Sequence, residues 1–199
     1  MINDGHNGKT FFLNTPADLL EKLRWEVDAL WTSAPFALQQ RAYMAMNCLI
    51  TSWQMKDWVY SALKGSNRLK DLDDYAGRAI KDNKEFGVYL TGACPQMKLA
   101  YQIATASKHR EVKKNNDPKV RTEVVKIHIE LRNGCEQNEL VIFDGQESIV
   151  AHRLIYCLYV YWEGVLHALG LMPDEETFVS EGDRPSQPGT PRLRLKRPE

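Results

Sequence analysis

The feature that most restricts the fold is a long stretch without glycine or proline, between Pro35 and Gly65. Hydrophobic residues recur there every three or four positions, which is the spacing of one face of an α-helix. A helix over 35–63 would be roughly 45 Å long at ~1.5 Å per residue. Its hydrophobic face is wide enough to contact several neighbours at once. The sequence therefore predicts a helical bundle built around one long helix.

Shorter helices are predicted on both sides of this one. Thr15 is placed to cap the first helix, Pro16 suits its first position, and Asp18 complements the positive end of the helix dipole. A third helix is expected over 69–80, where hydrophobic residues again recur at helical spacing. Pro95 opens a fourth helix that is expected to run to about residue 112.

The hydrophobic period changes after residue 120. Hydrophobic residues at 125, 127, 129 and 131 alternate with polar ones, which is the pattern of a half-buried strand. Asn133-Gly134 begins a turn, and Leu140–Phe143 supplies a second strand of an antiparallel hairpin over about 122–143. Ser148 is placed to cap a last helix over 149–169. Since its IYCLYVYW stretch is hydrophobic on nearly all sides, that helix is expected to lie centrally.

These patterns predict a mainly α fold, a helical bundle with a β-hairpin inserted before the last helix. The chain of 199 residues is long enough for one domain with a sizeable core, which we expect over 15–172. Residues 1–14 form an N-terminal extension. Residues 173–199 are rich in proline, glycine and charge, and they are expected to form a disordered tail that ends in a basic segment.

The formal net charge is zero, so no global electric field draws the whole molecule to nucleic acid or membrane. Residues 106–126 nevertheless hold seven Lys or Arg against three acids, so a polyanionic partner would have to meet this local patch. The N-terminus does not have the form of a signal peptide, and the most hydrophobic run, Leu154–Trp162, is too short to span a bilayer. We expect a cytoplasmic protein with no contact to a membrane.

The four cysteines are far apart and form no CxxC or Cys/His metal-binding spacing. Cys48 and Cys157 fall in hydrophobic helical runs, where free thiols behave as small hydrophobic residues. His128 and His152 have no neighbours in the sequence that would complete a metal site. We therefore expect a reduced protein without a metal or other cofactor.

The stretch ATASKHREVKKN, residues 104–115, carries the candidate chemistry. On a helical wheel Lys108 falls on the hydrophobic side of the fourth helix, whereas His109 falls on the polar side. Both residues have ordinary structural explanations. A histidine near a helix C-terminus complements the dipole, and a lysine beside a hydrophobic stripe extends its ammonium to water.

The functional alternative is a phosphate-binding corner at the same place. Its hydrogen-bond donors and positive charge would come from Ser107, Lys108, Arg110, Lys113 and Lys114. His109 titrates near neutral pH, so it would serve as the catalytic acid or base with Lys108 beside it.

Asp57 is the second unusual residue. In WQMKDW it falls on the hydrophobic face that includes Ile50 and Trp53. Because an unpaired buried carboxylate is costly, Asp57 must either reach solvent or have a cationic partner. We expect structural pairing with one of the basic residues at 108–110. Glu163 in the last helix raises the same question.

The order of elements and several short motifs resemble uncharacterised bacterial proteins of the HEPN-like helical-bundle type. The motifs are SWQMKDW on the long helix, a break at ACP, a helix ending in ASKH, and a Trp-containing helix after the hairpin. The resemblance extends from Pro35 to about Leu171. It implies a HEPN-like bundle and a dimer, and in active members a metal-independent ribonuclease of toxin–antitoxin pairs or phage defence.

The resemblance also implies where such an activity would be found. Active members carry an arginine, four to six residues and then a histidine, on a helix. His109 has no arginine at that distance upstream. Arg121 and His128 have the spacing, but they fall in a predicted loop and strand, and we attribute that match to chance. The resemblance thus supports the fold more than a ribonuclease.

Three functions stay open from the sequence. The first is an RNA- or nucleotide-directed protein of the HEPN-like class, based on the architecture and the basic corner. The second is a non-catalytic interaction module, a homodimer or a subunit bound to a partner protein. The third is a small-molecule sensor that uses the aromatic residues of the bundle, Trp53, Trp58, Tyr101 and Trp162.

Overall fold

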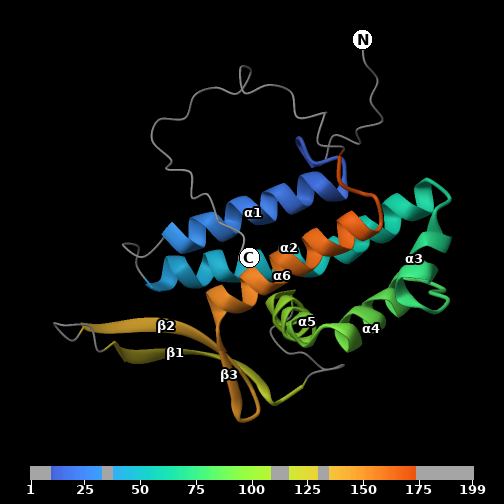
Figure 1. Cartoon of the computed structure of the whole chain (residues 1–199). Coiled ribbons are helices and arrows are strands. Elements are labelled where there is room, and N and C mark those ends of the chain that lie inside the picture. Colours follow the sequence, from blue (N-terminus) through green and yellow to red (C-terminus); the bar gives the residue numbers. More distant parts are fainter. Residues whose placement is uncertain (1–9, 33–37, 109–116, 130–134, 174–199) are drawn as a thin grey trace, which may run out of the picture.

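The computed structural model describes residues 10–32, 38–108, 117–129 and 135–173. Of residues 126–129 and 135–137 only the backbone is described. The elements follow one another as α1 (Pro16–Thr32), α2 (Leu38–Gly65), α3 (Leu69–Ala76), α4 (Asn83–Ala93), α5 (Pro95–Lys108), β1 (Val120–Ile129), β2 (Cys135–Asp144), β3 (Glu147–Val150) and α6 (Ala151–Ala168) (Figure 1). The predicted N-terminal extension and tail lie mostly outside these residues.

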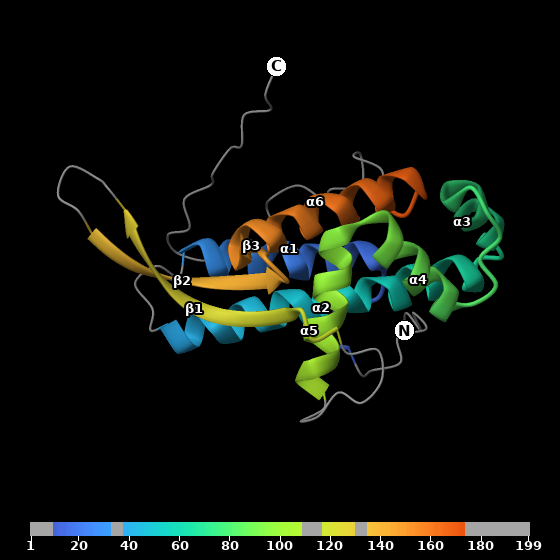
Figure 2. The ribbon, with the colours of Figure 1, turned by 90° about the horizontal axis from the view of Figure 1, so that it is seen from below.

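The long helix α2 is the element on which the bundle is built. Each of the other five helices of the described chain contacts it. Figure 1 shows α1 and α6 running along α2, and Figure 2 shows α5 crossing it. The prediction of a mainly helical bundle with antiparallel strands before the last helix is confirmed.

The start of α1 follows the predicted capping. The Asp18 backbone N–H donates to Thr15 Oγ1 at 3.2 Å, and the Thr15 backbone N–H donates to Asp18 Oδ2 at 2.8 Å. The two side chains thereby satisfy two backbone donors that a helix start leaves without partners.

The third predicted helix is too long, and one helix was not predicted. α3 ends at Ala76, because Gly77 adopts a left-handed conformation with φ of 64° and closes the helix. A separate helix, α4, begins after Asp82, whose side chain accepts from the Glu85 backbone N–H at 2.7 Å. Gly87 lets α4 approach α2 closely, since a Cβ atom there would lie 3.3 Å from the Trp53 ring.

The sheet is larger than the predicted hairpin. Its strand order is β1-β2-β3, and both pairings are antiparallel. The prediction that Ser148 caps the last helix is wrong, because Ser148 lies in β3 opposite Phe143. α6 begins three residues later, and Val150 precedes it in an extended conformation without a side-chain cap.

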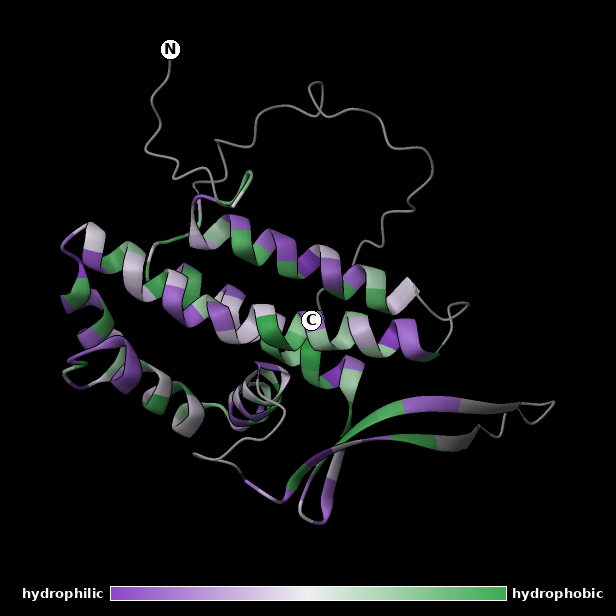
Figure 3. Cartoon of the chain, turned by 180° about the vertical axis from the view of Figure 1, so that it is seen from behind, coloured by the Kyte–Doolittle hydropathy of each residue, from purple (hydrophilic) through white to green (hydrophobic). Residues whose placement is uncertain are grey.

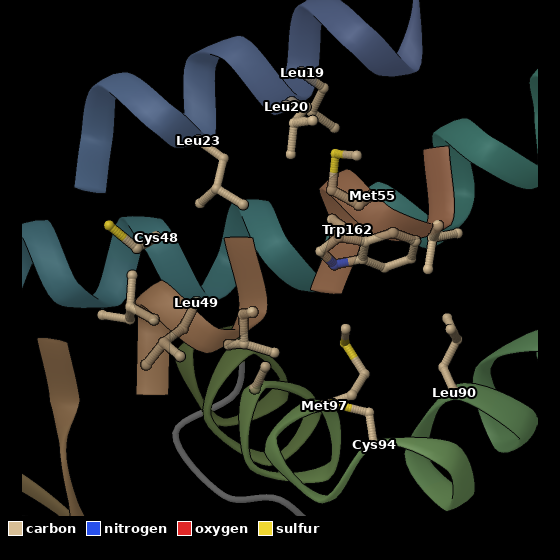
Figure 4. Packing of buried hydrophobic residues seen from close by; sticks show 14 of the residues in the cluster. Leu19, Leu20, Leu23, Cys48, Leu49, Met55, Leu90, Cys94, Met97 and Trp162 are labelled. Carbon is tan, nitrogen blue, oxygen red and sulfur yellow. The ribbon is translucent and has the colours of Figure 1, made fainter. Parts of the chain in front are cut away.

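The core lies where α6 packs against α1, α2 and α5. Figure 4 shows the Trp162 ring between Met55 of α2 and Met97 of α5, and all three side chains are completely buried. The opposite side of α6 is exposed, however, at Tyr156 and Val160. The helix thus packs against three others as a central helix would, while the side that carries Tyr156 and Val160 faces solvent. No helix in the described part of the chain is both long and hydrophobic enough to cross a membrane.

We expect Trp162→Ala to lower the free energy of unfolding by about 3–5 kcal/mol, because it leaves a cavity in a closely packed core. Trp162→Phe keeps most of the ring and should cost clearly less. The matched control is Trp25→Ala on α1, where 70% of the side chain is exposed and the change should stay within about 0.5 kcal/mol. Urea denaturation of the three variants measures these differences, and equal losses at positions 25 and 162 would contradict the packing described.

Candidate functional site

The predicted basic corner lies at the end of α5, and the structure describes two of its residues. Ser107 is exposed and its hydroxyl donates to the Ala104 carbonyl at 2.7 Å. Lys108 is also exposed and has no ion-pair partner among the described residues. The other four residues of the corner, His109, Arg110, Lys113 and Lys114, lie outside the described part of the chain.

Lys108 does not lean on the core as its helical position suggested. Met97 and Ala104, with which it aligns, are buried, but Ala104 is the last buried residue of α5. Figure 2 shows this end of the helix projecting beyond α2. The helix extends about one turn past the core, so the hydrophobic side of its last turn faces solvent.

A second lysine of α5, Lys98, is neutralised by its neighbours. Its ammonium lies 2.8 Å from Asp117 and 3.2 Å from Asp144. Hydrogen bonds to Asp117 and then to Asp144 raise the pKa of Lys98, and the same contact with Lys98 lowers the pKa of Asp117. These half-buried groups connect α5 to the segment before β1 and to the end of β2. They leave Lys98 little net charge to offer a ligand.

Asp57 was predicted to reach solvent or to pair with one of the basic residues at 108–110, of which only Lys108 lies in the described part of the chain. The Asp57 carboxylate is half-exposed, and its Oδ1 atom accepts from Lys56 and from the Asn83 amide of α4. Asp57 has a structural partner as expected, but that partner is the preceding residue. Asp57 also lines a shallow groove between α2 and the start of α1, together with Asn14, Pro16, Trp58, Ser61 and Ala62.

Four elements meet at a group of charged and aromatic side chains that sequence reasoning missed. Glu139 of β2 lies between Arg41 of α2 and His152 of α6. Its Oε2 atom is 3.4 Å from Arg41 Nη2 and 3.8 Å from His152 Nδ1. The Trp31 ring of α1 packs against the His152 ring, with centroids 4.7 Å apart. We refer to these four residues as the Glu139 cluster.

The ion pair in the Glu139 cluster is largely removed from water. Only 13% of the Arg41 side chain and 12% of the Glu139 side chain are exposed. Arg41 also donates to the Asn138 carbonyl at 3.1 Å, so it holds both the side chain and the backbone of β2. Removing one partner of such a pair leaves a buried charge uncompensated.

The histidine of the Glu139 cluster favours its neutral form. Burial lowers the pKa of His152, and the positive charges of Arg153 and Arg41 lower it further, against an opposing effect of Glu139. A neutral imidazole can accept a proton, but the charges of Glu139 and Arg41 already compensate each other. The groove beside Asp57 is lined by other residues, so it does not bring a ligand to His152. The arrangement therefore suits a link between the sheet and the helices better than a reaction centre.

The two buried thiols in the described part of the chain are poor candidates for a reaction centre. Burial raises the pKa of the Cys48 thiol to about 12 and also raises that of Cys94, so neither thiol is a ready nucleophile. Glu163 accepts a hydrogen bond from the Tyr159 hydroxyl at 3.1 Å. No group of histidine, cysteine and acidic residues in the described ranges could hold a metal ion.

Comparisons with known proteins give no relative from which a function could be transferred. No protein-family model, curated protein or solved structure matches the chain. Function must therefore be inferred from the contacts above and from the sequence motifs.

The free energy of unfolding should fall as the pH decreases from about 7 to 5, because the unfolded chain takes up a proton on residue 152 more readily than the folded chain. The contribution of a neutral His152 is complete above its ordinary pKa of about 6.5 and is lost as the pH falls through the lower, folded value. His152→Asn should reduce this slope. His167→Asn, at the exposed far end of α6, should keep it. Urea denaturation at several pH values measures the slopes, and an unchanged slope in His152→Asn would refute the assignment.

Native thiol labelling should separate Cys157 from Cys48. Cys157 is exposed, contrary to the sequence expectation, and should react rapidly with an alkylating reagent at pH 8. A thiol with a pKa of about 12 is ionised in roughly one molecule in ten thousand at that pH, so Cys48 should react only on unfolding. Mass spectrometry of digested peptides follows each cysteine separately. Full labelling in denaturant is the control, and rapid native labelling of Cys48 would contradict its burial.

Proposed function

We propose that the chain is an RNA- or nucleotide-directed protein of the HEPN-like helical class, which binds phosphate at the end of α5. The observation that carries this proposal is the position of Lys108. It lies on a projecting helix end, it is exposed, and it has no acidic partner in the described part of the chain. Arg110, Lys113 and Lys114 follow within six residues and add positive charge.

The contrast with other basic residues supports this choice of site. Lys98 and Arg41 form ion pairs with nearby carboxylates, so their charges contribute to the fold. Lys108 is available for a ligand because nothing in the described chain neutralises it. Since the net charge of the protein is zero, binding of a polyanion depends on such a local excess of positive charge.

Binding at this corner does not require catalysis. His109 is the only residue there that could transfer a proton near neutral pH, and it has no arginine at the spacing of HEPN-type ribonucleases. A catalytic version of the proposal therefore assigns the acid or base to His109 with Lys108 as the phosphate ligand. The toxin–antitoxin or phage-defence setting follows from the resemblance in sequence and is part of the same proposal.

A non-catalytic interaction module is the second candidate, and the exposed aromatic residues favour it. Trp25 and Trp31 of α1 are 70% and 53% exposed, and Tyr43 of α2 is 59% exposed. Aromatic side chains are enriched in protein interfaces because they bury a large area with few rotatable bonds. In this version the partner is a second copy of the chain or another protein.

We expect the purified chain to bind tRNA or total RNA in a filter-binding assay, with an affinity that falls as salt rises. Lys108→Gln should weaken binding and reduce the salt slope by about one phosphate contact. The matched control is Lys64→Gln, which removes an exposed lysine from the end of α2 and should leave binding unchanged. Equal binding by both variants would rule out the α5 corner as the site.

Catalysis and partner binding need separate measurements. Intact RNA after incubation with both the wild-type chain and His109→Ala would reject the catalytic version, while binding could persist. Light scattering addresses the second candidate. A strictly monomeric chain that co-purifies with no partner would count against an interaction module.

A further inference from the structure

The outer edge of the sheet is formed by β1, and it carries an open row of backbone groups. Because β2 lies between the other two strands, β1 is hydrogen-bonded to β2 alone among the described residues. β1 has ten residues, and its register with β2 is continuous from Val120 opposite Asp144 to Ile129 opposite Cys135. Such a long unpaired edge is a template for another strand unless the protein protects it.

The hydrogen-bond pattern identifies the groups that face outward. The Gly145 backbone N–H donates to the Lys119 carbonyl at 3.0 Å, which fixes the alternation along the antiparallel pair. The backbone groups of Arg121 and Glu123 consequently point to β2, and those of Thr122 and Val124 point away from the sheet. The open edge therefore presents its donors and acceptors at the even-numbered residues.

Two of the usual protections of an edge, a bulge and a proline, are missing from β1. The continuous register excludes a bulge within β1, and Pro118 precedes the strand. Arg121 and Glu123 form an ion pair, with 2.6 Å between Arg121 Nε and Glu123 Oε1. The Arg121 guanidinium also lies over the Phe143 ring. Val124, near the middle of the strand, is 52% exposed. Figure 1 shows the β1–β2 hairpin extending away from the helices, and Figure 3 shows both hydrophobic and hydrophilic residues along it.

We propose that the chain self-associates by antiparallel pairing of β1 with β1 of a second copy, about a two-fold axis at Val124. In this register Val124 lies opposite Val124 of the second copy, and residue 119 lies opposite residue 129. The whole strand is paired, and two exposed valines cover each other. A shift by one residue per strand, with the axis at Glu123, would instead place two carboxylates opposite each other, which is unfavourable.

A second copy fits this edge better than an unrelated peptide, because one two-fold contact satisfies the outward groups of both strands. Two edge strands bury less area than a standard stable interface, so the dimer should be reversible and depend on concentration. The proposal is independent of RNA binding. It rests on the interaction-module candidate and names the partner, and a dimer through the helices would support that candidate while failing the test below.

Disulfide cross-linking tests the register. Val124→Cys, in a background with Cys135 and Cys157 replaced by serine, should form a covalent dimer on mild oxidation. Directly opposite Cα atoms in an antiparallel pair are about 5.5 Å apart, which a disulfide can span. Thr122→Cys is the matched control. Its counterpart in the second copy would be displaced by about 13 Å along the strand, so it should stay monomeric.

Sedimentation equilibrium over a concentration series tests the association itself. Val124→Lys should weaken dimerisation by at least about tenfold, because two lysines would oppose each other at the axis. Val124→Thr should keep the dimer. Circular dichroism and thermal melting check that each variant is folded. A wild-type chain that stays monomeric throughout, or a dimer indifferent to Val124→Lys, would overturn the proposal. Cross-linking of Thr122→Cys in place of Val124→Cys would overturn the register.

Discussion

The burial of Trp162 is the interaction on which the rest of the structure depends. Its ring fills the space where α2, α5 and α6 approach one another, so these three helices are held at one point. α5 crosses α2 there, and its direction sends the last turn beyond the core. Lys108, at the proposed phosphate site, is therefore exposed because Trp162 packs on Met97, about three turns earlier in α5.

The sheet depends on the bundle through a second set of contacts. Arg41 and His152 hold Glu139 from two helices, while Lys98 holds Asp117 and Asp144. These contacts hold the hairpin against the helices, and within the described residues the other edge of β1 stays unpaired. The buried Arg41–Glu139 ion pair contributes little net stability, because the cost of desolvation offsets the attraction. Loss of either partner would leave a buried charge and loosen the hairpin from the helices. These six charged or titratable residues act to position the sheet against the helices.

Local signals explain how much of the fold could be predicted. Thr15, Pro16 and Asp18 act within one turn of helix, and the alternation after residue 120 describes a strand by itself. α4 was missed although Asp82 and Glu85 carry a capping signal, because Gly87 weakens the helical pattern and its role depends on Trp53 of another helix. The Ser148 cap failed for a similar reason, since pairing with β2 outweighs a local preference.

The candidate sites depend even more on contacts between distant parts of the chain, which the sequence does not reveal. Glu139 lies 98 residues after Arg41 and 13 residues before His152, and no recognised spacing links the three. A charged residue at a predicted buried position was the available signal, because such a residue must find a partner. That reasoning was applied to Asp57, which turned out to be half-exposed, and not to Glu139, which is buried. A candidate functional group is thus recognised by its environment. For Lys108, the proposed phosphate ligand, that environment is the solvent beyond the end of the core.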